Sequence, residues 1–436
     1  MAVQTTIRIR RDTAANWASV NPVLSAGEQG LETDTGYIKM GSGTASWNNL
    51  NYSTRPPQVD TFVAVGNYAI SKQVTASVVT LTTLTNHPFA IGDRIAVATN
   101  NATIDNDYAT PIIITASTSN TISYVKSSPN VALTNLSPYG NIWKMQFWTM
   151  PRGAVSVNFS GTGAGGGGGS GARRAIASGR AGGAGGGGAL FNHITYAASQ
   201  IISGSATLPG SATLFLGLPN GGAPGLSVTI DDTNGNSGTP GAGYAGNGGI
   251  TFGASNDIAG LAGGLWNFLL RQGAQGSGGT TTVGQSNGQT SYGMWLGGAG
   301  GNGTLTTGGA AGSPVAGPSG GGGGAGASAT STVTSAGGGP GLSFIARTIN
   351  PGAVGVSGGT SASPDAYGGS SLAIIPGLPG TGGGGGAYIS GRVGGIGANG
   401  RNYGTGGGGG AASDNGFNSG SGGFGGDASL VITTYF

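Results

Sequence analysis

The stretch GTGAGGGGGSG, residues 161–171, decides how the second two thirds of this chain can fold. Of the 97 glycines, 89 follow Met150, whereas glycine averages about 7% of residues in proteins. Similar runs recur at GGAGGGG (182–188), SGGGGGAG (319–326), GTGGGGGA (380–387) and GTGGGGG (404–410). Such a segment has too few side chains for an ordinary core, and ordering glycine carries a high entropic cost. We therefore expect backbone to pack on backbone through main-chain hydrogen bonds.

The spacing of the glycines narrows the geometry of that packing. The runs do not keep glycine at every third position, which excludes collagen. Left-handed extended glycine helices with three residues per turn fit better, with hydrogen atoms or methyl groups at the packed positions. The flanking segments MPRGAVSVNFSG (150–161) and DASLVITTYF (427–436) have strand character. We expect them to be neighbours in one sheet that closes the region at its base.

Composition excludes several classes of function. Charged residues make up 7% of the chain, the net charge is +3, and neither Lys nor Glu occurs after Lys144. Without a basic stripe, nucleic acid is not expected as a partner. The chain has no cysteine and two histidines, His87 and His193, which disfavours metal sites and disulfides. No apolar run of about 18 residues or secretory signal core is present, so we expect no membrane insertion and synthesis in a host cytoplasm.

The chain divides into three segments that differ in composition and in their pattern of expected strands. The 3.6-residue periodicity of a helix is weak in all three. Residues 1–55 hold short strands, residues 56–150 a small β-sandwich or barrel, and residues 151–436 the glycine-rich region. In the middle segment, Gly92-Asp93 and Ser119-Asn120 supply turns. The expected strands are TTIRIR (5–10), GLETDTG (30–36), GYIKMGSG (36–43), VTASVVTLTT (74–83), DRIAVAT (93–99), TPIIITAST (110–118) and TISYV (121–125). The fold class is therefore all-β.

The first segment resembles the N-terminal module of bacteriophage tail fibres and tropism-determinant proteins. The matching positions are Arg11 to Thr13, Trp17, Asn21 to Leu24, Gly27 to Gly30, Asp34, Thr35, Lys39 to Gly43, and Trp47 to Leu50. One departure is Ser42, where the family often has Asp. The resemblance implies a homotrimer in which residues 1–55 attach to a virion tail or baseplate protein.

The last segment resembles the glycine-rich domain at the tips of phage tail fibres and adhesins. FWTMPRGAVSVNFSGTGAGGGGGSG (147–171) and GGFGGDASLVITTYF (422–436) carry the likeness. It implies a sandwich of polyglycine II helices whose distal loops bind a bacterial surface glycan or outer-membrane protein. HPFAIGDRIAV (87–97) is similar to small β domains inserted in phage fibres, which implies a spacer role for residues 56–150.

Catalytic and cofactor motifs are weak throughout the chain. GxGxxG matches are expected by chance among so many glycines, and the helix that a nucleotide site needs is missing. Asp105 and Asp107, or Asp231 and Asp232, are carboxylate pairs of the kind that cleave glycans. Asp231, Asp232 and Asn234 also form a candidate calcium site. Ordinary turn chemistry explains these residues better, so we expect no enzymatic activity, no metal and no cofactor.

Aromatic residues lie between the glycine runs and are the best candidates for recognition. A glycine slab cannot bury them all, so some pack on its faces and others contact a sugar or protein receptor. We expect elaborated distal turns at 189–220, 265–296 and 342–375. The predicted receptor contacts are Trp266, Arg271, Tyr292, Trp295 and Tyr367.

Together these features predict a phage tail fibre protein, located in the virion, that mediates host recognition and adsorption through its C-terminal tip. Two alternatives stay open. One is a tail-fibre depolymerase that cuts surface polysaccharide, although no long β-solenoid repeat is visible. The other is a purely structural glycine-rich fibre protein.

Overall fold

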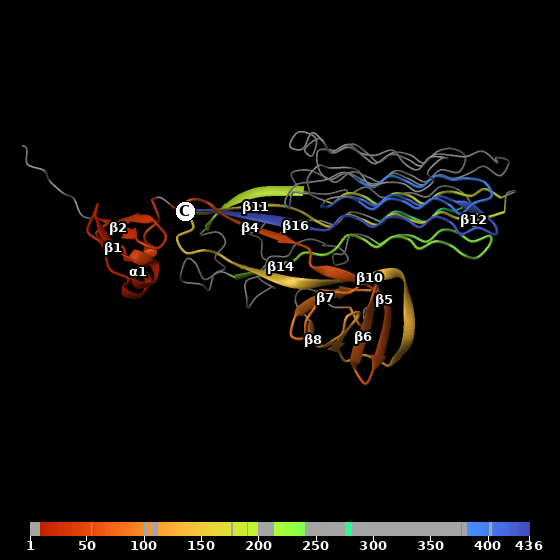
Figure 1. The fold of residues 1–436 in the computed structure, drawn as a ribbon, viewed down its shortest axis with the longest axis horizontal. Coiled ribbons are helices and arrows are strands. Elements are labelled where there is room, and N and C mark those ends of the chain that lie inside the picture. Colours follow the sequence, from red (N-terminus) through yellow and green to blue (C-terminus); the bar gives the residue numbers. More distant parts are fainter. Residues whose placement is uncertain are drawn as a thin grey trace, which may run out of the picture.

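The computed structural model describes residues 9–53, 55–99, 101, 103–105, 112–175, 178–189, 191–198, 213–239, 275–280, 376, 382–400 and 403–436. This part of the chain is elongated (Figure 1). A small N-terminal module lies at one end, a β-sheet in the middle and the glycine-rich slab at the other end, with a barrel beside the slab. Strands dominate the described elements, which confirms the all-β fold class.

The N-terminal module has a three-stranded sheet and a core of two stacked indoles. Its sheet has the order β1 (Arg10–Asp12), β2 (Gln29–Glu32), β3 (Ile38–Met40), and β1 is parallel to β2. Trp17 on helix α1 (Ala14–Val20) stacks on Trp47, at the start of the short 3-10 helix η1 (Trp47–Asn49), with ring centroids 4.1 Å apart. Leu24 and Leu50 complete this buried core.

Helix α1 was not expected from the sequence, because seven residues are too few to show the 3.6-residue repeat of apolar side chains that marks a helix. Its ends nevertheless carry local signals. The Thr13 side chain accepts a hydrogen bond from the Asn16 N–H, and Asn21 closes the helix in the left-handed conformation at φ 47°.

A lysine and a glutamate are buried beside the indole stack. Lys39 donates to the Trp47 carbonyl at 2.9 Å, and its Nζ lies 4.3 Å from the centroid of the Tyr52 ring. The Tyr52 hydroxyl donates to Glu32 at 2.6 Å. Burial lowers the pKa of Lys39 from 10.5 to about 8, although Glu32 opposes this shift.

The middle segment forms a closed barrel. Its strands run in the order β10-β5-β6-β9-β8-β7, and pairing of β10 with β7 closes the circle. Fully buried Leu81, Ile95, Ile122 and Tyr124 fill the interior. The strand bounds are β5 (Gly66–Thr75), β6 (Val78–Thr83), β7 (Arg94–Ala98), β8 (Ile112–Ser117), β9 (Thr121–Val125) and β10 (Val131–Thr149).

One expected strand of the barrel, residues 74–83, is interrupted by a turn. The run 74–83 covers the end of β5, a two-residue turn and the whole of β6, because Ala76 and Ser77 adopt φ values of 50° and 64° and reverse the chain. Two consecutive left-handed residues form a tight turn whose twist suits a hairpin. The β-branched residues on both sides hid this turn from pattern analysis.

The base sheet joins segments that are far apart in the sequence. It has the order β13 (Phe191–Ala197), β11 (Ser156–Thr162), β16 (Ser429–Tyr435), β4 (Gln58–Val63), and all its pairs are antiparallel. The pairing of β11 with β16 confirms that the two ends of the glycine-rich region are neighbours.

The barrel segment is connected to this base twice. Strand β4 is an edge of the base sheet, and β10 extends beyond the barrel to pair with β14 (Thr213–Gly217). Trp148 of β10 packs in the same core as Phe159, and its indole N–H donates to Asp60 at 2.8 Å. The three-domain division at residues 55 and 150 stays a prediction, but these pairings cross the limit at 150.

The glycine-rich slab is held together by main-chain hydrogen bonds that repeat every three residues. In the run 163–173, Gly165, Gly168 and Gly171 donate to one neighbouring run, and the residues between them donate to two others. The carbonyl groups of the same run accept from three further runs. The six neighbouring runs are 181–187, 222–225, 233–239, 276–279, 407–413 and 420–426. One run is thus bonded on all sides.

Glycine is required where these runs approach one another. A Cβ atom on Gly168 would lie 2.0 Å from the Gly408 carbonyl oxygen, and one on Gly171 would lie 2.0 Å from that of Ala411. Ala164 and Ala184 are buried positions where a methyl group is accommodated. The alternation of glycine with alanine and serine therefore records which positions face a neighbouring backbone.

We expect Gly422→Ala to destabilise the slab and Ser421→Ala to be tolerated. A Cβ on Gly422 would lie 2.0 Å from the Gly168 carbonyl oxygen, whereas half-buried Ser421 already carries one. Overpacking of this kind costs about 1–3 kcal/mol. Thermal unfolding followed by circular dichroism measures both variants. Equal melting of the two would contradict backbone-limited packing.

The N-terminal module should become more stable as the pH rises from about 8 to about 10. In this window the unfolded chain binds a proton at Lys39 that the folded chain has released, so the unfolding free energy increases with pH. The chain has four lysines, so side-chain NMR can follow the titration, with Lys39→Met as the assignment control. A Lys39 midpoint near 10.5 would show that the amine is not buried.

Candidate functional site

The candidate functional site is the end of the slab farthest from the base sheet. Strand β12 (Arg173–Arg174) lies at this distal end in Figure 1 and pairs in parallel with β15 (Ser413–Asp414). The glycine runs reverse direction there. The described parts of the distal turns are residues 172–175, 178–181, 229–234, 388–393 and 412–418.

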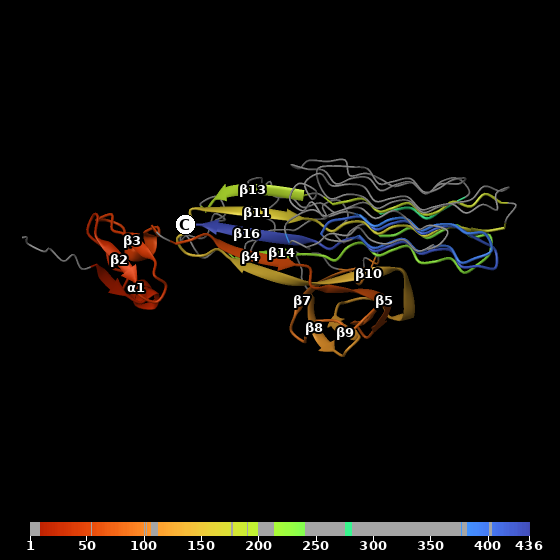
Figure 2. The same cartoon turned by 45° about the horizontal axis from the view of Figure 1, so that its top comes forward.

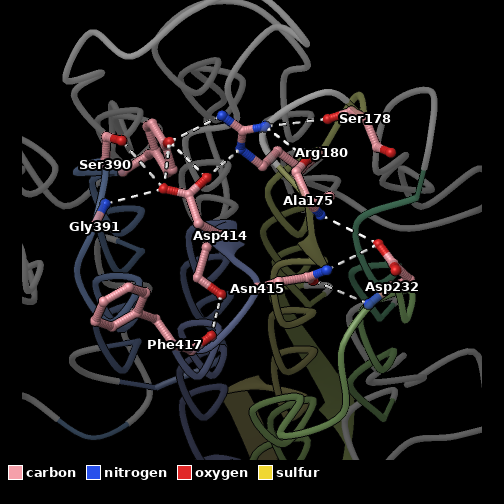
Figure 3. A network of polar contacts seen from close by, with 11 residues as sticks. Ala175, Ser178, Arg180, Asp232, Ser390, Gly391, Asp414, Asn415 and Phe417 are labelled. Atoms are coloured by element: carbon pink, nitrogen blue, oxygen red, sulfur yellow. Dashed lines mark hydrogen bonds and ion pairs between the residues drawn. The ribbon is translucent and has the colours of Figure 1, made fainter.

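A buried ion pair joins three of these turns (Figure 3). Arg180 Nε lies 3.0 Å from Asp414 Oδ1, and the two side chains are 0% and 5% exposed. Arg180 also donates to the Tyr388 hydroxyl at 3.0 Å, and that hydroxyl donates to Asp414 at 3.1 Å. The Ser390 hydroxyl and the Gly391 N–H donate to Asp414 Oδ2 at 3.2 and 2.9 Å.

This network supplies the side-chain packing that the glycine runs lack. The Arg180 guanidinium also donates hydrogen bonds to the carbonyls of Ala175 and Ser178, both at 3.1 Å. Its guanidinium lies 5.3 Å from the centroid of the Tyr388 ring, and burial raises the pKa of the Tyr388 hydroxyl. A buried charge pair requires nearly complete hydrogen bonding to be tolerated, and such bonding fixes the relative positions of the turns.

A second, more exposed set of contacts ties the turn at 229–234 to its neighbours. Arg173 Nε lies 2.6 Å from Asp231 Oδ1, which also accepts the Gly416 N–H at 2.9 Å. The Gly416 N–H and Arg173 lower the pKa of Asp231. Asp232 accepts the Ala175 N–H at 3.2 Å and exchanges hydrogen bonds with Asn415.

These contacts argue against the candidate calcium site at Asp231, Asp232 and Asn234. Arginines engage two of the three side chains, because Arg174 donates to Asn234 as Arg173 does to Asp231. Within the described ranges, no three His, Cys, Asp or Glu residues are grouped to hold a metal ion.

Apolar side chains are exposed at or next to the distal turns. Ile230 is 70% exposed and Val393 is 56% exposed. Ile396 and Phe417 are also exposed, and Arg392 lies beside Val393. Exposed apolar groups held by rigid turns, with polar groups around them, are typical of surfaces that bind another macromolecule.

The predicted receptor contacts Trp266, Arg271, Tyr292, Trp295 and Tyr367 all lie outside the described residues, and they stay predictions. The same holds for nearly all of the predicted turns 265–296 and 342–375. Within the first of these, residues 275–280 form a slab run.

The expectation of a distal turn at 189–220 was wrong. This segment holds β13 and β14, which pair with β11 and β10 at the base. Phe191 and Tyr196 are buried, and Tyr196 packs with Phe159 in the base core. A non-glycine insertion marks a turn, but it does not reveal at which end of the slab the turn lies.

The other sequence candidates serve the fold. Asp105 accepts hydrogen bonds from the N–H groups of Thr99 and Asn101, at 2.7 and 3.0 Å, and burial raises its pKa. Asp107 lies outside the described residues. His87 contacts the Thr121 carbonyl at 3.1 Å, and His193 contacts Asn158 at 3.1 Å.

Sequence reasoning missed the buried Arg180–Asp414 pair. A signal was present, because charged and strongly polar residues interrupt the glycine runs as Arg173-Arg174, Asp231-Asp232 and Asp414-Asn415. Each interruption coincides with a distal turn. Which of these turns lie side by side, and hence the contact of Arg180 with Asp414, depends on which runs are neighbours in the slab.

We expect Asp414→Asn to destabilise the distal turns by about 3–5 kcal/mol, because it leaves the buried Arg180 charge uncompensated. Arg180→Met combined with Asp414→Leu should recover part of that loss, since no buried charge remains. The control is Asp231→Asn, whose carboxylate is 53% exposed and should affect melting little. Denaturant unfolding measures all three. Equal losses of unfolding free energy for Asp414→Asn and Asp231→Asn would show that the buried pair contributes no more than the exposed one.

Two comparisons bear on the chain. Residues 7–45 match the Major tropism determinant N-terminal domain. A hyaluronoglucosaminidase of Streptococcus pyogenes phage H4489A is 40% identical over 50 residues, which cover 12% of this chain and 14% of that protein. None of the helices that the structure describes has the length and apolarity that crossing a bilayer requires.

The second match corrects one expectation. The prediction that the chain is not an enzyme is contradicted by its similarity to a phage hyaluronoglucosaminidase, which makes a depolymerase activity a candidate. The first match confirms the tropism-determinant-like character of the N-terminus. Together, the two matches point to a phage tail or receptor-binding protein.

Proposed function

We propose that this chain is a bacteriophage tail fibre protein that recognises the host cell through the distal end of its glycine-rich slab. The observation that carries the proposal is the combination of a tropism-determinant N-terminal domain with exposed apolar side chains on fixed turns at the opposite end. The receptor would be a bacterial surface glycan or an outer-membrane protein.

We propose that the slab is a bundle of polyglycine II helices that acts as a rigid platform. Support comes from hydrogen bonds that return to the same neighbour every three residues and from backbone contacts that exclude a Cβ. Three residues per turn is the period of such helices. A platform of this kind would leave the turns free to vary in sequence without altering the runs.

The N-terminal module would attach the fibre to a virion tail or baseplate protein as part of a homotrimer. Its core and its sheet are complete within residues 10–50, which supports a separate attachment unit. Three distal ends in one fibre would bind several receptors at once, so that a weak single contact could give firm adsorption.

Ile230→Ser should reduce adsorption of the fibre to host cells by about thirtyfold, the effect of losing a central anchor worth about 2 kcal/mol. The matched control is Ile91→Ser in the barrel, since Ile91 is 67% exposed and Ile230 70%. Flow cytometry with labelled protein measures both. Normal adsorption by a folded Ile230→Ser variant would move the contact surface elsewhere, and Trp266→Ala and Trp295→Ala would then be the next variants.

A fragment of residues 56–436 should keep host binding, and a fragment of residues 1–55 should not bind cells. The longer fragment must begin before β4, because that strand is an edge of the base sheet and β10 pairs with β14. Pull-down on host cells measures both fragments. Cell binding by residues 1–55 would reverse the assignment of the two ends.

The match to a phage hyaluronoglucosaminidase favours a second candidate, a tail-fibre depolymerase. The purified full chain would then release reducing ends from hyaluronan or from host surface polysaccharide. Boiled protein is the control. Release of reducing ends would establish the activity, and its absence on both substrates would leave recognition as the function.

A further inference from the structure

A pocket lies where the barrel meets the glycine-rich slab, on the base side and away from the distal turns. Its volume is about 400 Å³. One wall comes from β5 of the barrel and the other from two runs of the slab. The lining residues are Tyr68, Asn399, Gly400, Tyr403, Phe424, Gly425, Gly426 and Asp427.

Three aromatic rings line this pocket, although the slab around it consists mostly of glycine. Tyr68 and Phe424 have ring centroids 4.6 Å apart at an angle of 47°. The Tyr68 hydroxyl donates to the Gly221 carbonyl at 2.9 Å, which orients its ring. Tyr403 and Phe424 are both half-buried, so part of each ring stays accessible.

One carboxylate among the described lining residues, that of Asp427, faces the same space. Asp427 Oδ1 accepts the Gly221 N–H at 2.9 Å, and the side chain remains exposed to solvent. Protein surrounds it closely enough that desolvation raises the pKa of Asp427. Among the lining residues that the structure describes, Asp427 is the one with a formal charge, and that charge is negative when the carboxylate is ionised.

We propose that this pocket binds an organic ammonium group, held between the three aromatic rings and the Asp427 carboxylate. Aromatic faces attract cations through their quadrupole, and recognition of quaternary ammonium groups uses several such rings together. The carboxylate adds a full opposite charge beside the rings. An anion would be repelled by Asp427, and a neutral sugar would leave that charge uncompensated.

The site is independent of the proposed distal receptor surface. Its residues come from β5 and from the base ends of slab runs, whereas the distal turns lie at the other end of those runs. The fibre would thus carry a small-ligand site near the base in addition to its tip.

The test is binding of choline to the full chain by isothermal titration calorimetry, with 3,3-dimethylbutan-1-ol as the uncharged analogue of the same shape. We expect choline to bind at least about tenfold more tightly than the neutral analogue. Asp427→Asn, which keeps the oxygen that accepts the Gly221 N–H, should weaken choline binding by about tenfold or more. The control is Asp34→Asn, an exposed carboxylate in the N-terminal module, which should change nothing.

Phe424→Leu is a second test in case Asp427→Asn does not fold. This variant removes one aromatic ring and keeps the Asp427 charge. A loss of choline affinity in this variant supports the cage. Absence of choline binding, equal binding of the neutral analogue, or unchanged binding in both variants overturns the proposal. Because the readout uses a soluble probe and no cells, failure here is distinct from failure of host adsorption.

Discussion

The fold depends on one interaction, the hydrogen bond between a backbone N–H group and a carbonyl of a neighbouring glycine run. It repeats every three residues and connects the run 163–173 to six neighbours. The approach is so close that a Cβ at Gly165 would lie 1.8 Å from the Thr405 carbonyl oxygen. Each such bond contributes modestly on its own, and their density offsets the entropic cost of ordering so much glycine.

A slab built in this way leaves no interior space for functional side chains. Side-chain chemistry is therefore concentrated where the runs turn or where another unit covers them. At the distal end, the buried Arg180–Asp414 pair fixes the turns, and apolar side chains such as Ile230 remain exposed. At the base, Tyr68 of the barrel meets Phe424 of the slab. The two functional proposals concern the distal turns and the pocket beside the barrel, because these are the places where the slab can carry side chains.

The base sheet explains how a slab without an ordinary core is attached to the rest of the chain. Strand β4 precedes the barrel, β10 leaves it, and both contribute to the base. The barrel is thus an insertion between strands that belong together. Its place beside the slab creates the pocket at Asp427, whose lining neither unit supplies alone.

The sequence by itself determined the features that local chemistry controls. Glycine content predicted backbone-on-backbone packing, β-branched runs predicted an all-β chain, and the strand character of the two end segments predicted their pairing in the base sheet. The N-terminal likeness rests on residues such as Trp17 and Trp47, which form the core of that module.

Only the tertiary structure decided which runs are neighbours, and therefore which distant residues meet. Arg180 and Asp414 are 234 positions apart, and their contact follows from the order of the runs in the slab. Strands β13 and β14 of the segment 189–220 lie at the base because they pair with β11 and β10. Glycine runs are nearly identical in sequence, so a run by itself does not specify which other run it will contact. Contacts at the turns and in the base sheet join residues that no local pattern connects.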